Sequence, residues 1–242
     1  MAHERSAKEA DGAGELRPGG EPRIGSKAMD DKTILFADLS GFTALTEVHG
    51  DERATAIVLR FYDMARSVLR EDAALVKTIG DAVMIVCSEA RSCVLIALDL
   101  QALVNAEPAF PRMRAGLHVG PVTEAAEDFF GNAVNIAARV AAYARSEQIL
   151  CTEAVASSLG SPSPCLMSRI GPVAMKNVHQ GVVIFELRCG DVIEQAFVDP
   201  VCRMHVSVRD AAGHVSHGSE DVYFCSFECM QAFKVAHDEE AL

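Results

Sequence analysis

The order in which β-rich runs alternate with amphipathic helical segments constrains the fold of this chain more than any other feature of its sequence. Apolar runs typical of strands occupy residues 33–39, 75–79, 82–87, 113–119, 148–151 and 182–187. Apolar residues at helical spacing occupy about 51–70, 89–106 and 132–145. We therefore expect an α+β fold with a ferredoxin-like βαββαβ core, in which a mostly antiparallel sheet carries helices on one face.

Composition divides the chain into three parts. Residues 1–30 are rich in Gly, Glu, Arg and Pro and nearly lack large apolar side chains, so we expect a disordered tail there. The α+β pattern fills residues 31–190. After Cys189 the sequence becomes rich in turn residues and cysteine, which predicts a second, small module over 191–242.

Charge and hydropathy exclude some classes of partner. The formal net charge of −12 argues against binding to a nucleic-acid backbone. The most apolar helical stretch, Cys93 to Val104, is short and interrupted by Asp99 and Gln101, so no membrane partner is expected. The N-terminus lacks the apolar centre of a signal peptide, and we expect a soluble, cytoplasmic protein.

Two aspartates stand where metal ligands would be useful. Asp38 ends the first apolar run and precedes Ser40-Gly41, a turn whose backbone N–H groups favour phosphate. Asp81 occupies the Gly80-Asp81 hairpin turn, which a ferredoxin-like sheet places beside the end of the first strand. Two adjacent carboxylates repel each other unless a hard divalent cation lies between them. The alternatives are a helix N-cap for Asp38 and a plain turn residue for Asp81.

Three further side chains suit the handling of a nucleotide. Lys77 lies in an apolar strand, where it needs an acceptor unless its ammonium group reaches water at a sheet edge. Asn135 and Arg139 are four residues apart and share one helix face. An amide beside a guanidinium can orient a sugar and stabilise phosphoryl charge, although a solvated helix face would look similar.

Four separate blocks of the chain resemble the class III adenylyl/guanylyl cyclase catalytic domain, in that family's order and spacing. The blocks are Ile34–Leu45, Lys77–Asp81, Arg114–Gly120 and Phe130–Arg139, and the resemblance covers about residues 31–188. It implies that Asp38, Asp81 and the backbone of Leu39 hold two Mg²⁺ or Mn²⁺ ions. The turn that the resemblance assigns to the nucleotide phosphates consists of Ser40, Gly41, Phe42 and Thr43.

The same resemblance implies roles for residues that follow in the chain. Lys77 and Asp128 would read the base, Asn135 would orient the ribose and Arg139 would stabilise the transition state. Lys176 lies near the position of a triphosphate-binding lysine. The family works as a head-to-tail dimer, so the resemblance implies a homodimer with ATP sites at the interface.

The chemistry of the base-reading pair favours ATP over GTP. A lysine only donates hydrogen bonds and an ionised aspartate only accepts them, which matches N1 and the exocyclic amine of adenine. We therefore expect an adenylate cyclase, in which the ribose 3′-hydroxyl attacks the α-phosphorus with Asp38 or bulk water as the proton acceptor. The alternatives are a catalytically silent, cyclase-like binding or dimerisation domain and another nucleotidyl-transferring enzyme such as a diguanylate cyclase, whose Gly-Gly-acidic turn is absent.

The C-terminal residues 197–240 resemble a YHS domain, a small treble-clef-like module. Cys225 and Cys229 fall one turn apart at a helix start, and Cys202 supplies a third sulfur. We expect these cysteines to bind Zn²⁺ or Cu⁺, with Met204 or His205 nearby, and the module to sense metal or redox state. The alternative is three core thiols without a metal. Arg203 stands where family members usually have glycine.

Overall fold

The computed structural model describes residues 30–176, 181–189, 197–206, 211–217 and 220–238. We call residues 30–189 the main domain and residues 197–238 the C-terminal module. The expected disordered tail, residues 1–30, lies almost entirely outside the described residues. The expected boundary near residue 190 also falls at a segment, 190–196, that is outside them.

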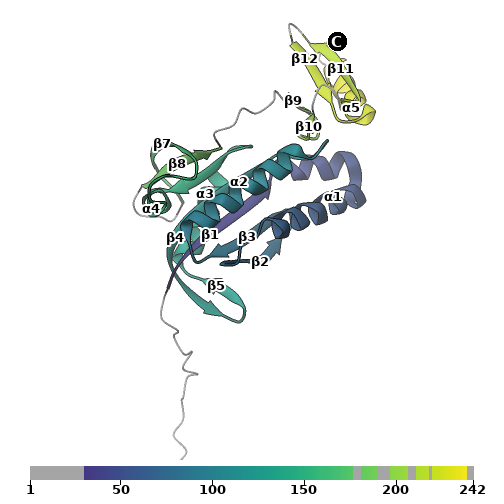
Figure 1. The fold of residues 1–242 in the computed structure, drawn as a ribbon. Coiled ribbons are helices and arrows are strands. Elements are labelled where there is room, and N and C mark those ends of the chain that lie inside the picture. The colour runs from purple at the N-terminus through teal and green to yellow at the C-terminus, as the bar shows by residue number, and fades with distance from the viewer. Residues whose placement is uncertain (1–29, 177–180, 190–196, 207–210, 218–219, 239–242) are drawn as a thin grey trace, which may run out of the picture.

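One twisted sheet forms the centre of the main domain (Figure 1). Its strands follow the order β2-β3-β1-β4-β6-β8-β7, and β5 pairs with β4. All described pairings are antiparallel except that of β4 with β6. The strands are β1 (Asp30–Leu39), β2 (Ala73–Ile79), β3 (Ala82–Cys87), β4 (Met113–Ala125), β5 (Asp128–Phe130), β6 (Ile149–Thr152), β7 (Leu166–Val173) and β8 (Val182–Arg188). The first four strands with α1 (Phe42–Ser67) and α2 (Ala90–Ala106) make the expected βαββαβ core.

Helices cover both faces of the sheet, which corrects the expectation of helices on one face. Leu35 of β1 packs in the apolar cluster of α1 and α2, whereas its neighbour Ile34 packs against Ala133 and Ala137 of α3 (Asn132–Tyr143). Successive strand residues point to opposite faces. Ile34 and Leu35 are both fully buried, so β1 needs apolar cover on each side.

Helix α1 begins at Phe42 and is longer than the segment 51–70 that the helical periodicity predicts. Gly50 breaks it with φ 78° and ψ 168°, a conformation that is essentially restricted to glycine. The expected helix over 51–70 therefore corresponds to the part of α1 after the break. The earlier part, residues 42–49, follows directly from the Ser40-Gly41 turn.

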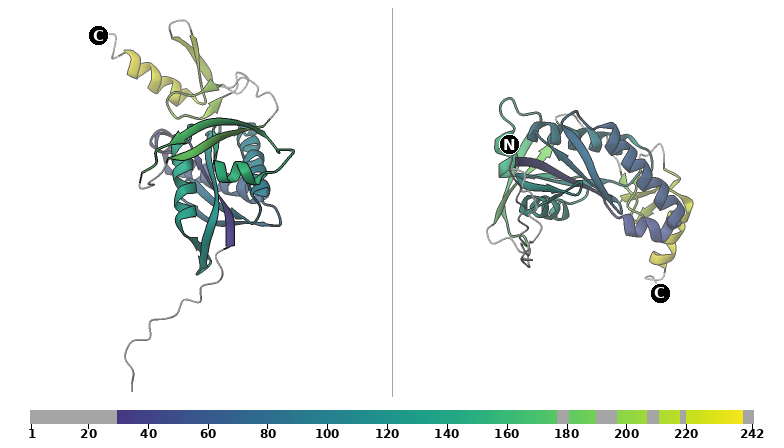
Figure 2. Two further views of the ribbon diagram at one scale, coloured as in Figure 1. Left: turned by 90° about the vertical axis from the view of Figure 1, so that its left-hand side faces the viewer. Right: turned by 90° about the horizontal axis from the view of Figure 1, so that it is seen from below.

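The C-terminal module packs on the main domain and shares its core. It consists of β9 (Phe197–Val198), β10 (His205–Val206), β11 (Gly213–His217), β12 (Glu220–Phe224) and α5 (Phe227–Asp238). Cys202, Met204 and Phe224 are fully buried in the same cluster as Leu45 of α1. A bridge between Pro111 and Met204 also joins the two parts. The right-hand view of Figure 2 shows the module beside α1.

No helix in the described part of the chain has both the length and the apolar content that a membrane crossing requires.

A glycine controls how closely α3 approaches the sheet. A Cβ added at Gly116 of β4 would lie 2.0 Å from the backbone nitrogen of Ala141 in α3 and 2.6 Å from its Cα. Both groups are backbone, so neither can move aside without displacing the helix. Because α3 carries Asn135 and Arg139, Gly116 sets their distance from the sheet.

We predict that Gly116→Ala lowers the free energy of unfolding by about 2 kcal/mol or more, since overpacking forces backbone shifts. Urea denaturation followed by circular dichroism measures the change. The matched control is Gly181→Ala, whose added Cβ would lie 3.4 Å from the Cβ of Pro172 and so has room. Its effect should stay below about 0.5 kcal/mol, and equal effects of the two variants would contradict the proposed close approach.

Candidate active site

The sheet register brings the two candidate metal-binding aspartates together. Asp38 pairs with Ala82 of β3, so the end of β1 lies beside the turn that joins β2 to β3. The backbone N–H of Leu39 donates to the carbonyl of Asp81, at 3.4 Å. The carboxyl group of Asp38 lies close enough to raise the pKa of the Asp81 carboxyl. The structure therefore places the two acids in one local environment, as the sequence predicts.

Burial and charge make this pair hold a proton. The pKa of Asp81 rises to about 6, because the carboxyl is partly desolvated and because the negative charge of Asp38 lies next to it. The charge of Arg114 opposes part of this shift. Above about pH 6 both carboxyl groups are ionised, and a divalent cation between them would relieve their repulsion.

Arg114 is a member of this site that the sequence analysis did not identify individually. Its Nε and Nη2 both donate to Oδ2 of Asp38, at 2.8 and 2.6 Å. Arg114 on β4 lies directly across from Asp38 on β1. The signal in the sequence was its place in the Arg114–Gly120 block, but only the strand register shows which acid it meets.

The turn after β1 has the geometry of an anion cradle. Gly41 adopts φ 78° and ψ 16°, the left-handed conformation that glycine tolerates, and precedes the first residue of α1. The Ser40 N–H donates to the carbonyl of Arg112 at 2.7 Å, which ties the turn to the start of β4. The Ser40 hydroxyl oxygen is buried and has no hydrogen-bond partner among the described residues. Phe42 and Thr43 begin the helix.

Lys77 and Asp128, the candidate base-reading pair, form an ion pair. Lys77 Nζ lies 2.6 Å from Asp128 Oδ2, and both side chains are half-buried. This hydrogen bond lowers the pKa of the Asp128 carboxyl. Lys77 therefore has the acceptor that its place in an apolar strand requires, and it is not a lysine with its charge simply in water.

The remaining candidates do not meet the acidic pair within this single chain. Asn135 is exposed and Arg139 half-buried on α3. Lys176 is exposed in the segment after β7. Among the described residues, no hydrogen bond or ion pair joins any of these three to Asp38 or Asp81.

The three cysteines of the C-terminal module gather around a residue that the sequence analysis missed. His49, in the first part of α1, joins Cys202, Cys225 and Cys229, and their ligand atoms all lie within 4.8 Å of one another. Hydrogen bonds with Cys202 and Cys225 lower the pKa of the Cys229 thiol. Nothing in the local sequence around His49 marks it, because its partners are more than 150 residues away.

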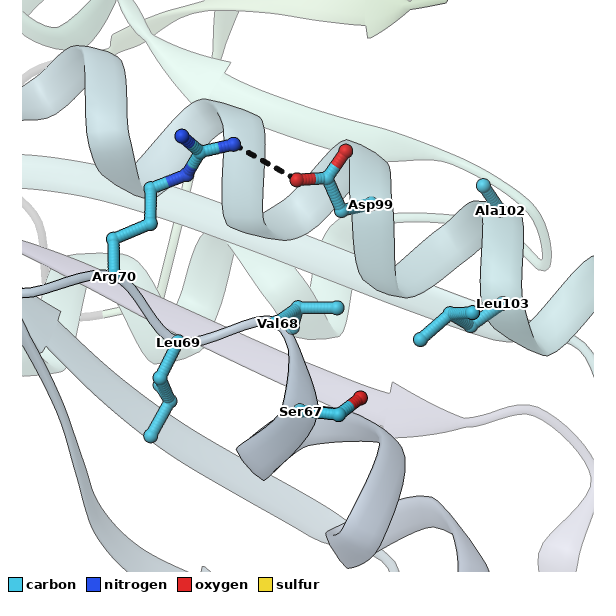
Figure 3. A pocket seen from close by; sticks show the side chains of 7 residues that line it. All are labelled: Ser67, Val68, Leu69, Arg70, Asp99, Ala102 and Leu103. Atoms are coloured by element: carbon cyan, nitrogen blue, oxygen red, sulfur yellow. Dashed lines mark hydrogen bonds and ion pairs between the residues drawn. The ribbon is translucent and has the colours of Figure 1, made fainter.

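A shallow depression lies elsewhere, between the end of α1 and α2 (Figure 3). Arg70 and Asp99 form an ion pair across it, at 2.9 Å. Its other lining residues are Ser67, Val68, Leu69, Ala102 and Leu103. None of the candidate site residues lines it, so it is separate from the acidic pair.

The structure thus combines an α+β sheet with two neighbouring acids beside a Ser-Gly turn at a helix start. The family described as the adenylate and guanylate cyclase catalytic domain matches residues 24–188. The chain belongs to this family.

Named relatives agree with that assignment. The chain is 36% identical over 185 residues to the pH-sensitive adenylate cyclase MT1302 of Mycobacterium tuberculosis, covering 75% of this chain and 46% of that protein. It is 35% identical over 127 residues to an adenylate cyclase of Streptomyces griseus, covering 52% of this chain and 32% of that protein. The chain thus spans half or less of the length of these curated relatives.

Solved structures share the fold. An adenylate cyclase of Trypanosoma brucei, solved in its monomeric state, superposes with a TM-score of 0.63 at 23% identity, over 72% of this chain and 94% of that one. A guanylyl cyclase domain of the fungus Blastocladiella emersonii, solved as a non-canonical dimer, gives a TM-score of 0.58 at 18% identity, over 65% of this chain and 96% of that one.

The shifted acid predicts a pH dependence of stability. Asp81 has an ordinary pKa of 3.8 in the unfolded chain and about 6 in the fold, so between these values the folded state binds more protons. Stability should therefore fall as the pH rises from about 4 to about 6.

Urea denaturation of the wild type and of Asp81→Asn, in buffer without divalent cations, measures this effect. The variant has no carboxyl group at position 81 to ionise, so its free energy of unfolding should fall less steeply as the pH rises from about 4 to about 6. Added Mg²⁺ should stabilise the wild type more at pH 7 than at pH 5. Parallel pH profiles of the two proteins would contradict the assignment.

Proposed function

We propose that this protein is an adenylate cyclase that converts ATP to 3′,5′-cyclic AMP and pyrophosphate. The observation that carries the proposal is the pairing of Asp38 with Asp81 beside the Ser40-Gly41 turn. The relatives named as adenylate cyclases support the choice of reaction.

The acidic pair suits two Mg²⁺ or Mn²⁺ ions. Asp38, Asp81 and the carbonyl of Leu39 offer the oxygen ligands that such ions prefer. Both hydrogen bonds from Arg114 end on Oδ2 of Asp38, so Arg114 orients this carboxylate without using Oδ1. When bound, the ions would supply Lewis acidity for the 3′-hydroxyl and charge neutralisation for the triphosphate.

The turn after β1 would hold the phosphates. Backbone N–H groups of residues 41–43 lie at the start of α1, where the helix favours negative charge. The buried Ser40 hydroxyl, unpaired among the described residues, is a donor that a phosphate oxygen could use. We also propose that Lys176 contacts the triphosphate.

Lys77 and Asp128 would read adenine. Their ion pair already fixes a donor beside an acceptor, at 2.6 Å. The ammonium group would donate to adenine N1, and the carboxylate would accept from the exocyclic amine. Guanine presents an acceptor and a donor in the opposite order, so both protein groups would be mispaired.

Asn135 and Arg139 require a second subunit. In one chain they make no hydrogen bond or ion pair with Asp38 or Asp81 within the described residues, and α3 covers the sheet face opposite α1. We propose a head-to-tail homodimer in which each site takes Asp38 and Asp81 from one subunit. The partner chain would supply base recognition, ribose orientation by the Asn135 position and charge stabilisation by the Arg139 position.

The residues then act together on one displacement. Asn135 holds the ribose so that its 3′-oxygen lies in line with the α-phosphorus. A bond forms between these atoms, the bond from the α-phosphorus to the bridging oxygen breaks, and pyrophosphate leaves. Arg139 stabilises the charge that develops, and the hydroxyl proton passes to Asp38 or to water.

The C-terminal module is proposed to be YHS-like and to hold a metal ion with Cys202, Cys225 and Cys229. The module consists of short strand pairs and one helix, so it has little hydrophobic core of its own. Arg203 has φ 66°, a left-handed conformation that explains why glycine would suit this position.

The activity and the shared site can be tested in one experiment. Purified protein is incubated with ATP and Mg²⁺ or Mn²⁺, and cyclic AMP and pyrophosphate are measured. Asp38→Ala and Arg139→Ala should each be inactive as homodimers. Random exchange makes about half of the dimers mixed, each with one intact site, so the mixture should regain about a quarter of wild-type activity.

The control mixes Asp38→Ala with Asp81→Ala. Both lesions remove metal ligands from the same half of a site, so every site stays damaged and no activity should return. Wild-type protein that binds ATP but forms no cyclic AMP with either metal would favour the catalytically silent alternative. An active wild type whose first mixture stays inactive would contradict the shared site.

Base selectivity gives a separate prediction. Lys77→Ala and Asp128→Ala should each lower the ratio of kcat/KM for ATP to that for GTP by about 10- to 100-fold, because mispaired buried groups no longer reject guanine. Steady-state kinetics with both nucleotides measures the ratio. Asn135→Ala is the control: it should lower both rates without changing the ratio.

A further inference from the structure

The cluster of His49, Cys202, Cys225 and Cys229 has the dimensions of a tetrahedral metal site. The Sγ atoms of Cys225 and Cys229 are 3.8 Å apart, and His49 Nε2 lies 3.5 Å from Cys229 Sγ and 3.8 Å from Cys225 Sγ. Metal bonds of about 2.3 Å to sulfur and about 2.0 Å to nitrogen separate tetrahedral ligands by about 3.5–3.8 Å. Cys202 Sγ lies 3.3 Å from Cys225 Sγ, and all three cysteines are free thiols.

A buried carboxylate organises the two loops that carry these sulfurs. Asp199 is fully buried. Its Oδ1 accepts from the N–H groups of Val201 and Cys202, and its Oδ2 accepts from the N–H of Cys225. One side chain thus fixes both loops before any metal arrives, and such support around a ligand set raises metal affinity.

The fourth ligand comes from the main domain. His49 closes the first part of α1, and the break at Gly50 follows it immediately. The Ser226 hydroxyl accepts from the Cys229 N–H at 3.2 Å and so caps the start of α5, and His49 Nε2 lies within 3.8 Å of the sulfurs of Cys225 and Cys229. The donor set is therefore complete only when the C-terminal module lies on the main domain.

We propose that these four residues bind one Zn²⁺ ion that fastens the C-terminal module to the first part of α1. Three thiolates and one imidazole are a donor set of structural zinc sites, and four protein ligands leave no open position for catalysis. His49 distinguishes this site from one contained in the module alone.

The site lies next to the turn proposed to hold the phosphates. Arg203 follows Cys202 directly and packs on Gly41: a Cβ added to Gly41 would lie 2.5 Å from the Arg203 Cβ. Zinc would thus hold residues 41–49 at both ends, through Arg203 at Gly41 and through the bond to His49. Loss of zinc should loosen this segment and raise KM for metal–ATP, a step that rests on the proposed function.

Zinc content tests the ligand set without any activity measurement. Full-length protein is loaded with Zn²⁺ under reducing conditions, and bound metal is measured by mass spectrometry and by competition with a chromophoric chelator. The wild type should bind one Zn²⁺ per chain, and His49→Ala should bind it at least about tenfold more weakly. His49→Cys should restore binding, and His214→Ala, a change at an exposed histidine of β11, should leave it unchanged.

Hydrogen exchange tests the fastening. Removing zinc from the wild type should increase hydrogen exchange in residues 42–49 as well as in α5. The control variant His214→Ala should respond in the same way. In His49→Ala, zinc should no longer protect residues 42–49. X-ray absorption of the zinc-loaded wild type should show imidazole scattering that His49→Ala lacks.

Three results would overturn the site. These are no bound zinc in the wild type, a Cys202–Cys225 disulfide that persists under reducing conditions, or unchanged zinc affinity in His49→Ala. Zinc binding without protection of residues 42–49 would overturn the fastening. Because none of these measurements needs turnover, an inactive protein that binds zinc as described would refute the proposed function and leave the zinc site standing.

Discussion

Register around β1 is the constraint on which the site depends. Antiparallel pairing with β3 brings Asp38 beside the turn that holds Asp81, and pairing with β4 brings Arg114 across from Asp38. Partial burial and the negative charge of Asp38 then raise the pKa of Asp81 to about 6. A slip of one residue along β1 would turn Asp38 to the other face of the sheet and separate it from Asp81.

The C-terminal module and the main domain share one hydrophobic core, which couples them. The module is too small to bury much apolar surface alone, so Cys202, Met204 and Phe224 complete their burial against the main domain. The same packing places the cysteine cluster at His49 and Arg203 at Gly41. A module that needs its neighbour for stability can also change that neighbour, which is the physical basis for expecting zinc loss to raise KM.

Much of the fold followed from local patterns, and the errors have identifiable causes. Alternating strand and helix periods predicted the βαββαβ core, because burial imposes those periods directly. The expectation of helices on one face was wrong, since the continuous apolar run of β1 requires cover on both faces. The helical periodicity marked only the part of α1 after Gly50, because the non-helical conformation of Gly50 separates two helical pieces.

The sequence by itself determined the kinds of residue available and their local settings: an acid at a strand end, a Ser-Gly turn, a lysine among apolar residues and cysteines one turn apart. Tertiary structure decided which of them meet. Arg114 finds Asp38 through strand register, Lys77 finds Asp128 across β2 and β5, and His49 finds cysteines from the far end of the chain. Such encounters depend on packing between distant segments, whose energies are summed over the whole fold, and no local pattern records them.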